Sequence, residues 1–352
     1  MDQDREKKYQ TVKQNIIDCV QSGTYSDKLP GERLLARRAG VSYMTVRRAI
    51  QELVNEGWLY KKPDYGTYVQ LKKATLFKTK KIGFLLLKRY ADGGLISPYF
   101  AQLFEYLDQA ARDKGLSLIY FPRIEDLSRN DGIHMIDALI VNFFPEMIKS
   151  IENFIKKVPV ILINSPAEGF QIPSIRIDNA QSSQRAVEYL VDCGHKKIGY
   201  LTGTPGWVST RERLSGYWNA LEARKIIYKP EWAYEGDFRF YTGYQSAEYF
   251  SKFKDKITAI ACANDEMALG LIKGLQEKGL QIPDDISIMG FDDIQMSSRI
   301  YPGLTTMRIN YEDIAQKTFE YIDEWLKKEE AFASETIIST DLIIRDTVRV
   351  IK

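Results

Sequence analysis

The sequence predicts an α/β protein in which a small helical head precedes two lobes, each built on a doubly wound parallel sheet. Two observations support this prediction. In Gly40–Ile50, GVSYMTVRRAI, a helix stop and a helix start lie within three residues. Further along, KKIGFLLL at Lys80–Leu87 is matched by KKIGYLTG at Lys196–Gly203. Each of these strand-like runs is followed by a loop and an amphipathic helix, which is the order of a βαβ unit.

The charge of the 352-residue chain is unevenly distributed. The whole chain has a net charge of +2, with 44% hydrophobic and 27% charged residues, which is ordinary for a globular protein. Residues 1–72 hold 13 Lys and Arg against 9 Asp and Glu, whereas the remainder holds 36 against 38. A basic head on a slightly acidic body indicates that the head alone faces nucleic acid.

Several classes of protein are disfavoured by composition. The cysteines Cys19, Cys193 and Cys262 are far apart and form no CxxC, which predicts reduced thiols. With two histidines in the chain, we expect neither a metal site nor a cofactor. The charged N-terminus lacks an apolar signal region, and the apolar runs are too short to span a bilayer. We therefore expect a cytoplasmic protein without a membrane partner. P-loop, HExxH and GxSxG motifs are missing, and no catalytic residue is predicted.

The head, residues 1–72, is predicted to hold three helices and a hairpin. An apolar stripe at helical spacing marks the first helix: Tyr9, Val12, Ile16, Ile17 and Val20. The second helix lies within Leu29–Gly40. The third runs from its N-cap Ser42 to about Asn55, with Val46, Ile50 and Leu53 buried. Trp58–Val69 then alternates around a turn, which predicts a wing. Together these elements predict a winged helix-turn-helix. A buried helical hairpin remains the alternative for Gly40–Ile50, because similar patterns occur in all-α cores.

The order of motifs in the head resembles the GntR family of bacterial DNA-binding domains. The motifs are LP-x-ER-x-LA at 29–36, GVS-xx-TVR-x-A at 40–49, L-xx-EG at 53–57 and GTYV at 66–69. The resemblance implies that double-stranded operator DNA is the partner. The expected DNA-binding residues are Arg33, Ser42, Tyr43, Met44, Thr45, Arg47, Arg48, Gly66 and Thr67.

Two residues depart from the GntR pattern. Tyr43 stands where the family usually has Arg, so the preferred bases differ, because Tyr cannot read guanine bidentately. Asp64 stands where the family often has Gly, and it would repel a phosphate unless it faces away. For Arg37, Arg38 and Arg48, a solvated basic face or simple phosphate attraction is an alternative to base reading. Residues 73–79 are expected to form a basic linker, either a partly folded tether or a plain spacer.

The body, residues 80–352, carries polar and aromatic residues just after its predicted strands. In open α/β sheets the ligand lies beyond the carboxyl ends of the strands. Carboxylates, amides and an arginine can bind adjacent hydroxyls, while aromatic rings stack on C–H faces, so the set suits a sugar. For each Asp alone, a helix cap or turn is the alternative. The residues of the set are Ser97, Tyr99, Phe100, Asn142, Asn164, Asp178, Arg211, Arg213, Phe238, Asn264, Asp265, Asp292 and Asp293.

The body resembles the effector domain of the LacI/GalR family, and so the periplasmic sugar-binding fold. The motifs are IDN at 177–179, GHKKIGYLTG at 194–203, RERLSGY at 211–217, CANDEMALG at 262–270, IPDDISIMGFDD at 282–293 and PGLTTM at 302–307. The resemblance implies that Arg213, Asn264 and Asp292 hold hydroxyls and that Phe238 stacks on the sugar ring. Asp178, Ser97, Tyr99 and Phe100 would complete the cleft. His195 is interpreted as a structural residue at a helix end and not as a general base.

The same resemblance implies two lobes and a homodimer. We expect the first lobe at about 80–194 and 308–331, and the second at about 195–307 and 332–352. The chain should cross between them near Gly194-His195, Thr306–Asn310 and Phe332–Glu335.

A GntR-type head on a LacI-type body resembles the arabinose-repressor type of regulator. The predicted function is a repressor that a sugar, arabinose or a related monosaccharide, releases from DNA. An activator, a corepressor-dependent regulator or a cytoplasmic sugar-binding protein are the alternatives. An enzyme using Asp292-Asp293 or Asp284-Asp285 as paired carboxylates is a further class, although adjacent loop residues seldom face one substrate.

Overall fold

The computed structural model describes residues 2–21, 24–25, 27–63, 65–70, 77–86, 97–128, 132–142, 147–167, 169–328 and 332–351. The chain divides into two compact units, Met1–Thr79 with Leu326–Glu329, and Lys80–Trp325 with Glu330–Lys352. We call the first unit the head and the second the body. Residues 73–76 of the predicted linker, and Asp64, lie outside the described residues.

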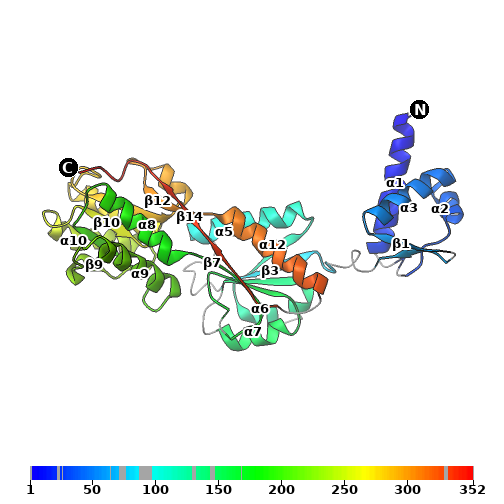
Figure 1. Ribbon diagram of the computed structural model, residues 1–352, viewed down its shortest axis with the longest axis horizontal. Helices are drawn as coiled ribbons and strands as arrows, with labels where there is room; N and C mark the ends of the chain where they lie inside the picture. Colours follow the sequence, from blue (N-terminus) through cyan, green and yellow to red (C-terminus); the bar gives the residue numbers. More distant parts are fainter. Residues whose placement is uncertain are drawn as a thin grey trace. The chain divides into compact units, whose positions relative to one another are not determined.

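The head consists of three helices packed on one small core (Figure 1). The helices are α1 (Asp2–Gln21), α2 (Glu32–Ala39) and α3 (Tyr43–Asn55). In α3, Val46, Ala49, Ile50 and Leu53 are fully buried, because their spacing puts them on one face. Gly40 ends α2 in the left-handed conformation, which lets the chain turn at once into the cap of α3.

A two-stranded antiparallel hairpin follows α3 as the wing. Its strands are β1 (Leu59–Lys62) and β2 (Gly66–Val69), with Tyr60 opposite Tyr68. The two rings stack with their centroids 5.6 Å apart, which stabilises the pair across the strands. Gly66 opens β2 at a φ of +108°, a conformation that L side chains rarely adopt. The predicted winged helix-turn-helix is therefore present.

The first lobe of the body is built on a six-stranded parallel sheet in the order β4-β3-β5-β6-β7-β13. Side chains of β5 and β6 are buried throughout, as expected for central strands covered on both faces. The strands are β3 (Lys81–Leu85), β4 (Ser117–Phe121), β5 (Ala138–Asn142), β6 (Val160–Ile163), β7 (Pro173–Ile177) and β13 (Ser334–Ile338). The helices are α5 (Pro98–Asp113), α6 (Ile124–Ser128), η2 (Gly132–Met135), α7 (Ile148–Ile155) and α12 (Tyr311–Lys328).

The second lobe repeats this plan in the order β9-β8-β10-β11-β12-β14, with β14 antiparallel to β12. Helix α8 packs along α9, and α10 packs along α11. The strands are β8 (Ile198–Leu201), β9 (Ala233–Tyr234), β10 (Ala259–Cys262), β11 (Ser287–Asp292), β12 (Thr305–Ile309) and β14 (Thr340–Ile343). The helices are α8 (Asn179–Asp192), α9 (Val208–Ala223), η4 (Pro230–Trp232), α10 (Phe240–Phe250), η5 (Ser251–Phe253), α11 (Asp265–Glu277) and η6 (Gln295–Ser298).

The two sheets confirm the internal repeat marked by KKIGFLLL and KKIGYLTG, and they show how its strands correspond. Strands β3 and β8, the matched sequence runs, occupy the same second position in their sheets. The edge strand beside β8 is the two-residue β9, which the sequence analysis missed because so short a strand leaves no alternating pattern. The run at Ala259–Cys262 is therefore the counterpart of β5.

Two of the three predicted crossings between the lobes are wrong. The chain leaves the first sheet after Ile177, because α8 already packs on α9 of the second lobe. It returns between β12 and α12, after Ile309, within the predicted crossing at Thr306–Asn310. The last crossing lies at Ser339, because β13 pairs with β7 in the first lobe (Figure 1). The helical and strand patterns identify each element but do not say which sheet it joins.

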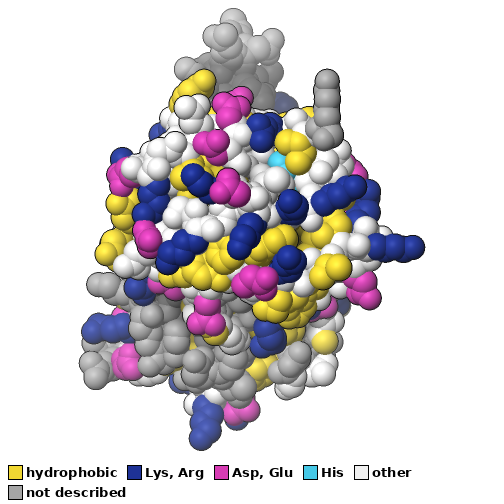
Figure 2. Space-filling model, turned by 90° about the vertical axis from the view of Figure 1, so that its left-hand side faces the viewer, with side chains coloured by type: hydrophobic (Ala, Val, Ile, Leu, Met, Phe, Trp, Pro, Cys, Tyr) yellow, Lys and Arg dark blue, Asp and Glu magenta, His cyan; other side chains and the backbone are white. Residues whose placement is uncertain are grey.

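The end of the molecule that carries the second lobe has a mixed surface. Figure 2 shows Lys and Arg side chains interspersed with Asp and Glu, and a band of hydrophobic side chains between them. None of the helices in the described part of the chain is both long and apolar enough to span a membrane.

Candidate functional site: a recognition helix and an interlobe cavity

The N-terminal end of α3 presents polar and flexible side chains to solvent. The Oγ of Ser42 accepts a hydrogen bond from the backbone N–H of Thr45 at 3.2 Å, so Ser42 caps the helix as predicted. Tyr43 and Met44 are exposed, with 39% and 66% of their surface accessible. A capped helix with an exposed first turn has the form that enters a DNA major groove.

The arginines of the head differ in their surroundings. Arg33 on α2 and Arg47 on α3 are exposed. The guanidinium of Arg48 lies over the ring of Tyr9, 4.4 Å from its centroid, so part of this side chain packs against α1. Arg47 is thus exposed without this ring contact, whereas Arg48 also contributes to the packing of the head.

The wing gathers basic side chains around an aromatic pair. Lys62 and Lys28 lie over the ring of Tyr68, 4.8 and 5.6 Å from its centroid. These lysines were not among the predicted DNA-binding residues, since none of the motifs of the head includes them. Thr67 is 9% exposed, so its side chain is buried in the head and does not face solvent as the predicted DNA contact would require.

A cavity of about 660 Å³ lies between the lobes of the body. Its walls come from the carboxyl ends of strands in both sheets and from the helices that follow them, as predicted for this class of sheet. Residues from the first lobe include Ser97, Tyr99, Phe100, Asn142, Asn164 and Arg176. Residues from the second lobe include Asn179, Arg211, Glu212, Arg213, Phe238, Asn264, Glu266 and Asp292.

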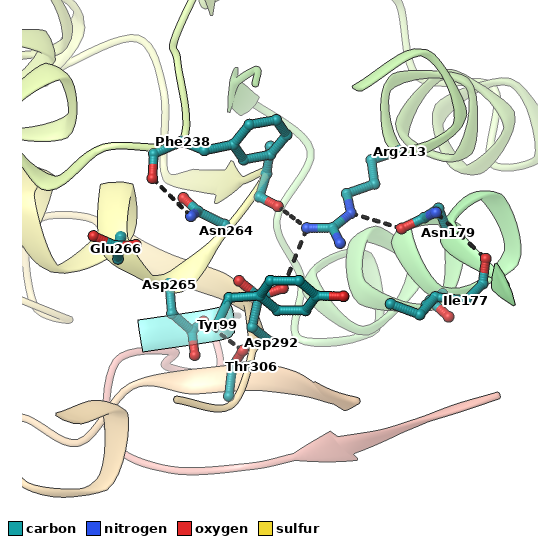
Figure 3. Close-up of polar contacts among 12 residues, drawn as sticks. Tyr99, Ile177, Asn179, Arg213, Phe238, Asn264, Asp265, Glu266, Asp292 and Thr306 are labelled. Atoms are coloured by element: carbon teal, nitrogen blue, oxygen red, sulfur yellow. Dashed lines mark hydrogen bonds and ion pairs between the residues drawn. The ribbon is translucent and has the colours of Figure 1, made fainter. Parts of the chain in front are cut away.

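Arg213 is the most connected residue of the cavity (Figure 3). Its Nε donates to Oδ1 of Asn179 at 2.8 Å, and its Nη1 donates to the carbonyl of Ala263. Nη1 also lies 3.4 Å from Oδ1 of Asp292. The guanidinium stacks on Phe291, 3.7 Å from the ring centroid. These contacts fix a buried cation whose remaining N–H groups face the cavity.

Asp292 faces the cavity beside Arg213 and is 3% exposed. Burial raises the pKa of Asp292 well above its usual range, and the charge of Arg213 opposes the shift. Its backbone has a φ of +120°, a strained conformation of the kind found at ligand sites. A carboxylate beside a fixed guanidinium can bind two adjacent hydroxyls.

The aromatic part of the cavity is formed by Phe238 and Trp207, whose rings stack with centroids 5.5 Å apart. Phe238 has a φ of +70°. Its carbonyl accepts a hydrogen bond from Nδ2 of Asn264 at 2.9 Å. A Cβ on Gly203 would lie 2.0 Å from the ring of Phe238, so the glycine leaves room for the ring. Trp207 was missed by the sequence analysis, since it belongs to none of the motifs.

The opposite wall is formed by Tyr99 and two asparagines. Nδ2 of Asn164 donates to the hydroxyl of Tyr99 at 2.7 Å and to Oδ1 of Asn142 at 2.9 Å. Burial raises the pKa of Tyr99, so its hydroxyl stays protonated and can donate to a ligand. The Oδ1 of Asn164 is buried without a hydrogen-bond partner in the described chain. This wall therefore offers both a donor and an acceptor.

Asp178 is a correction to the predicted site. Its Oδ1 accepts from the backbone N–H of Gln181 and caps α8, and its side chain does not line the cavity. The neighbouring Asn179 lines it instead, joined to Arg213 and to Glu212. The helix-cap alternative therefore applies to Asp178. The motif IDN contained both residues, and only the tertiary structure shows which of them faces inward.

The remaining carboxylates and His195 have structural partners. Asp265 accepts from Ser297 and Thr306 and from the backbone of Ile294. Asp293 pairs with Arg345 at 2.7 Å, and Asp285 accepts from the backbone of Gln281. His195 is fully buried, with one ring nitrogen bonded to Thr258 and the other to the carbonyl of Arg349. The paired carboxylates of the enzyme alternative thus do not share one site.

A winged helix-turn-helix joined to a two-lobed body with a cavity between its lobes defines the class of effector-controlled DNA-binding regulators. Residues 8–69 match the bacterial regulatory proteins of the gntR family, and residues 187–348 match the periplasmic binding protein-like domain. The chain is 29% identical over 328 residues to the probable HTH-type transcriptional repressor ExuR of Bacillus subtilis (strain 168). That alignment covers 90% of this chain and 97% of the relative.

Other relatives agree. The chain is 30% identical over 305 residues to the HTH-type transcriptional repressor PurR of Proteus mirabilis (strain HI4320), covering 82% of this chain and 88% of PurR. The crystal structure of the Escherichia coli repressor ascG is 25% identical and superposes with a TM-score of 0.65, covering 76% of this chain and 99% of ascG. A LacI family regulator from Enterococcus faecium with bound ribose, 23% identical, shares the fold with a TM-score of 0.67, covering 77% of this chain and 100% of that one.

The chain belongs to the LacI/GalR family of HTH-type transcriptional repressors, and its DNA-binding head is of the GntR type. It is a transcriptional repressor with an effector domain for a sugar or another small molecule, and the relatives it matches are repressors and not enzymes.

Proposed function

We propose that a monosaccharide binds in the interlobe cavity and releases the repressor from its operator. The observation that carries this proposal is the Arg213–Asp292 pair, which is buried at the cavity wall and flanked by the Phe238 ring. Carboxylate and guanidinium suit vicinal hydroxyls, and the ring suits the C–H face of a sugar. The effector-binding residues in this proposal are Ser97, Tyr99, Phe100, Arg213, Phe238 and Asp292, with Asn179 in place of Asp178.

The proposed mechanism is linkage between the cavity and the head. The chain crosses between the lobes after Ile177, Ile309 and Ile338, so the lobes can rotate about three short segments. A sugar held by both walls favours one arrangement of the lobes. In a homodimer, this arrangement sets the spacing of two heads on a two-fold operator. The coupling changes DNA affinity by about 1–3 kcal/mol. Because the operator lies on the chromosome, we place the protein in the cytoplasm.

The proposal is tested by measuring DNA and sugar binding together. Fluorescence anisotropy of a labelled duplex from the gene's own promoter region gives the DNA affinity. Titration with pentoses and hexoses, L-arabinose included, should raise the dissociation constant for DNA by about 5–150-fold for the true effector. A sugar that binds by calorimetry but tightens DNA binding would show a corepressor. Sugar binding without any DNA binding would favour the sugar-binding alternative.

A further inference from the structure

A hydrogen bond crosses the cavity from one lobe to the other. Glu266 lies in the first turn of α11 in the second lobe, and its Oε2 accepts from Oγ of Ser97 at 3.2 Å. Ser97 precedes α5 of the first lobe, and both residues line the cavity. The Ser97 hydroxyl makes no capping bond to its own helix, and its O–H donates to Glu266. The two side chains therefore join the cavity walls directly.

The role of Glu266 is not to cap α11. That end of the helix is already satisfied, because Oδ1 of Asn264 accepts from the backbone N–H of Met267 at 3.1 Å. Asp265, the neighbouring carboxylate, is buried away from the cavity. There it accepts hydrogen bonds from three donors. Among the three acidic or amide residues that begin α11, Glu266 is the one whose carboxylate lies between the lobes.

The charges of the cavity are unevenly paired. Arg213 is paired with Asp292, and Arg176 with Glu212 and Glu335. Arg211 is exposed and donates to the carbonyl of Gly206. Within the described chain, Glu266 has Ser97 as its hydrogen-bond partner and no ion pair. The Glu266 end of the cavity thus carries negative charge without a cation beside it.

The electrostatics of Glu266 agree with this arrangement. Burial raises the pKa of Glu266 to about 7, and the nearby charge of Asp237 raises it further, while the bond from Ser97 opposes the shift. The charge of Glu266 in turn contributes to the raised pKa of Asp292. A second anion placed at this end would meet Glu266, Asp237 and Asp292, whereas a hydroxyl or an amine would supply the missing donor.

We propose that Glu266 is an effector contact that joins the two lobes and selects effectors with hydrogen-bond donors over those that carry a carboxylate or a phosphate. This inference rests on the proposed binding of a sugar in the cavity. It adds a residue that none of the predicted contacts included. It also assigns the charge class of the effector, an uncharged or amino-bearing polyol.

The first test compares matched neutral and acidic sugars by calorimetry at pH 8, where Glu266 is ionised. Two pairs are compared: D-galactose with D-galacturonate, and D-glucose with D-glucose 6-phosphate. L-Arabinose and D-galactosamine are added as two further sugars that carry hydrogen-bond donors and no acidic group. For the neutral or amino sugar that binds, the acidic counterpart should bind at least about tenfold more weakly. Glu266→Gln should weaken binding of the neutral sugar about tenfold. It should also reduce the difference in affinity between the neutral sugar and its acidic counterpart. Glu277 is an exposed carboxylate at the other end of α11. The control Glu277→Gln should leave the affinity for the neutral sugar and the difference from its acidic counterpart unchanged.

Two results of this test would overturn the inference. One is an acidic sugar that binds the wild-type protein as tightly as its neutral counterpart. The other is unchanged affinity in Glu266→Gln for a sugar that responds to Arg213→Lys. If none of these sugars binds the wild-type protein, the proposed sugar effector fails, and the second test still decides whether Glu266 joins the lobes.

The second test needs no effector. Spin labels on Glu105→Cys of α5 and Lys273→Cys of α11, both exposed positions, report the distance between the lobes of the full chain in a Cys19→Ser background. Arg176→Gln removes a second contact between the lobes, the pair with Glu212. In that background, Ser97→Ala and Glu266→Ala should each broaden the distance distribution toward longer separations. Identical distributions in all variants would show that the Ser97–Glu266 bond does not hold the lobes.

Discussion

Asn264 donates a hydrogen bond from Nδ2 to the carbonyl of Phe238 at 2.9 Å, while its Oδ1 caps α11 through Met267 (Figure 3). One side chain therefore holds the end of a helix and the backbone of the aromatic residue that faces the cavity. The family resemblance implied that Asn264 binds hydroxyls. The structure shows that both ends of its amide already bond to backbone groups, so Asn264 also shapes the cavity.

Changing this amide should affect both stability and effector binding. Asn264→Asp keeps an acceptor for Met267, but it turns an oxygen instead of a donor toward the carbonyl of Phe238, so we expect weaker effector binding and lower stability. Asn264→Ala loses the cap as well, which costs about 1 kcal/mol of unfolding free energy. Urea denaturation and calorimetry measure the two effects. Equal sugar affinity in Asn264→Asp and wild type would show that the bond to Phe238 does not position the ring.

Arg213 should be required for the effector response and not for DNA binding. Arg213→Lys keeps the charge beside Asp292 but cannot reproduce the fork that reaches Asn179 and Ala263. We expect effector affinity to fall at least tenfold while operator affinity in the absence of effector is retained. Anisotropy with labelled operator and calorimetry with the effector measure both quantities. Unchanged effector affinity would place the binding site elsewhere.

Substitutions of Asp265 should be among those that most reduce the stability of the second lobe. Its carboxylate accepts from Ser297 Oγ and Thr306 Oγ1, each at 2.6 Å, and from the N–H of Ile294 at 3.1 Å. Asp265→Ala leaves three buried donors without an acceptor, and we expect a loss of roughly 3 kcal/mol or more. Asp265→Asn retains one acceptor oxygen, so it should lose less stability than Asp265→Ala. The control is Asp255→Ala on the exposed surface, and chemical denaturation is the measurement.

His195 should make the protein less stable as the pH falls below about 6.5. The carbonyl of Arg349 requires a proton on Nε2, and Nδ1 lies 2.9 Å from the hydroxyl of Thr258, which can donate to Nδ1 when the ring is neutral. Burial lowers the pKa of His195 below its unfolded value, so the unfolded chain takes up a proton that the folded chain resists. Stability is thus present above pH 6.5 and is lost as the pH falls toward the folded pKa.

The measurement is the free energy of unfolding at pH 7.5 and pH 5.5. His195→Gln should show a smaller loss between these values than the wild type. His134→Gln is the matched control, since His134 is the exposed second histidine. A loss of the same size in His195→Gln would assign the pH dependence to other groups.

Arg47 and Arg48 should separate DNA binding from packing. Arg47 is exposed, so Arg47→Ala should weaken binding to all duplexes and reduce the slope of log K against log salt by about 1. Arg48 lies over Tyr9, so Arg48→Ala should also lower the stability of the head. Salt titrations by anisotropy and thermal denaturation distinguish the two. An unchanged slope in Arg47→Ala would remove Arg47 from the phosphate contacts.

The elements of the head could be predicted closely from the sequence because each depends on local signals. The cap at Ser42, the stop at Gly40 and the buried stripe from Val46 to Leu53 are set by residues within a few positions of one another. The cavity was predicted in part. Arg213 and Asp292 belong to specific motifs, Phe238 was among the predicted contacts, and the structure brings all three to one wall.

Other residues of the cavity depend on pairings far along the chain. Glu266 faces Ser97 across 169 positions, and Arg176 meets Glu212 only because their lobes face each other. The choice between Asp178 and Asn179 depends on how α8 packs against α9. The crossings after Ile177 and Ile338 depend on which sheet accepts β7 and β13. None of these relations leaves a period or spacing in the sequence.

The amino-acid sequence by itself determined a basic winged head, a repeated parallel α/β body and the motifs that mark a sugar-binding regulator. The head and the repeated body follow from helix caps, hydrophobic periodicity and turn residues, which act over a few positions, whereas the motifs of the regulator were identified by their resemblance to known families. Only the tertiary structure decided which side chains share the cavity, which ones are helix caps, and which two residues bond from lobe to lobe. The reason is that contact between distant segments is set by the packing of whole sheets and helices.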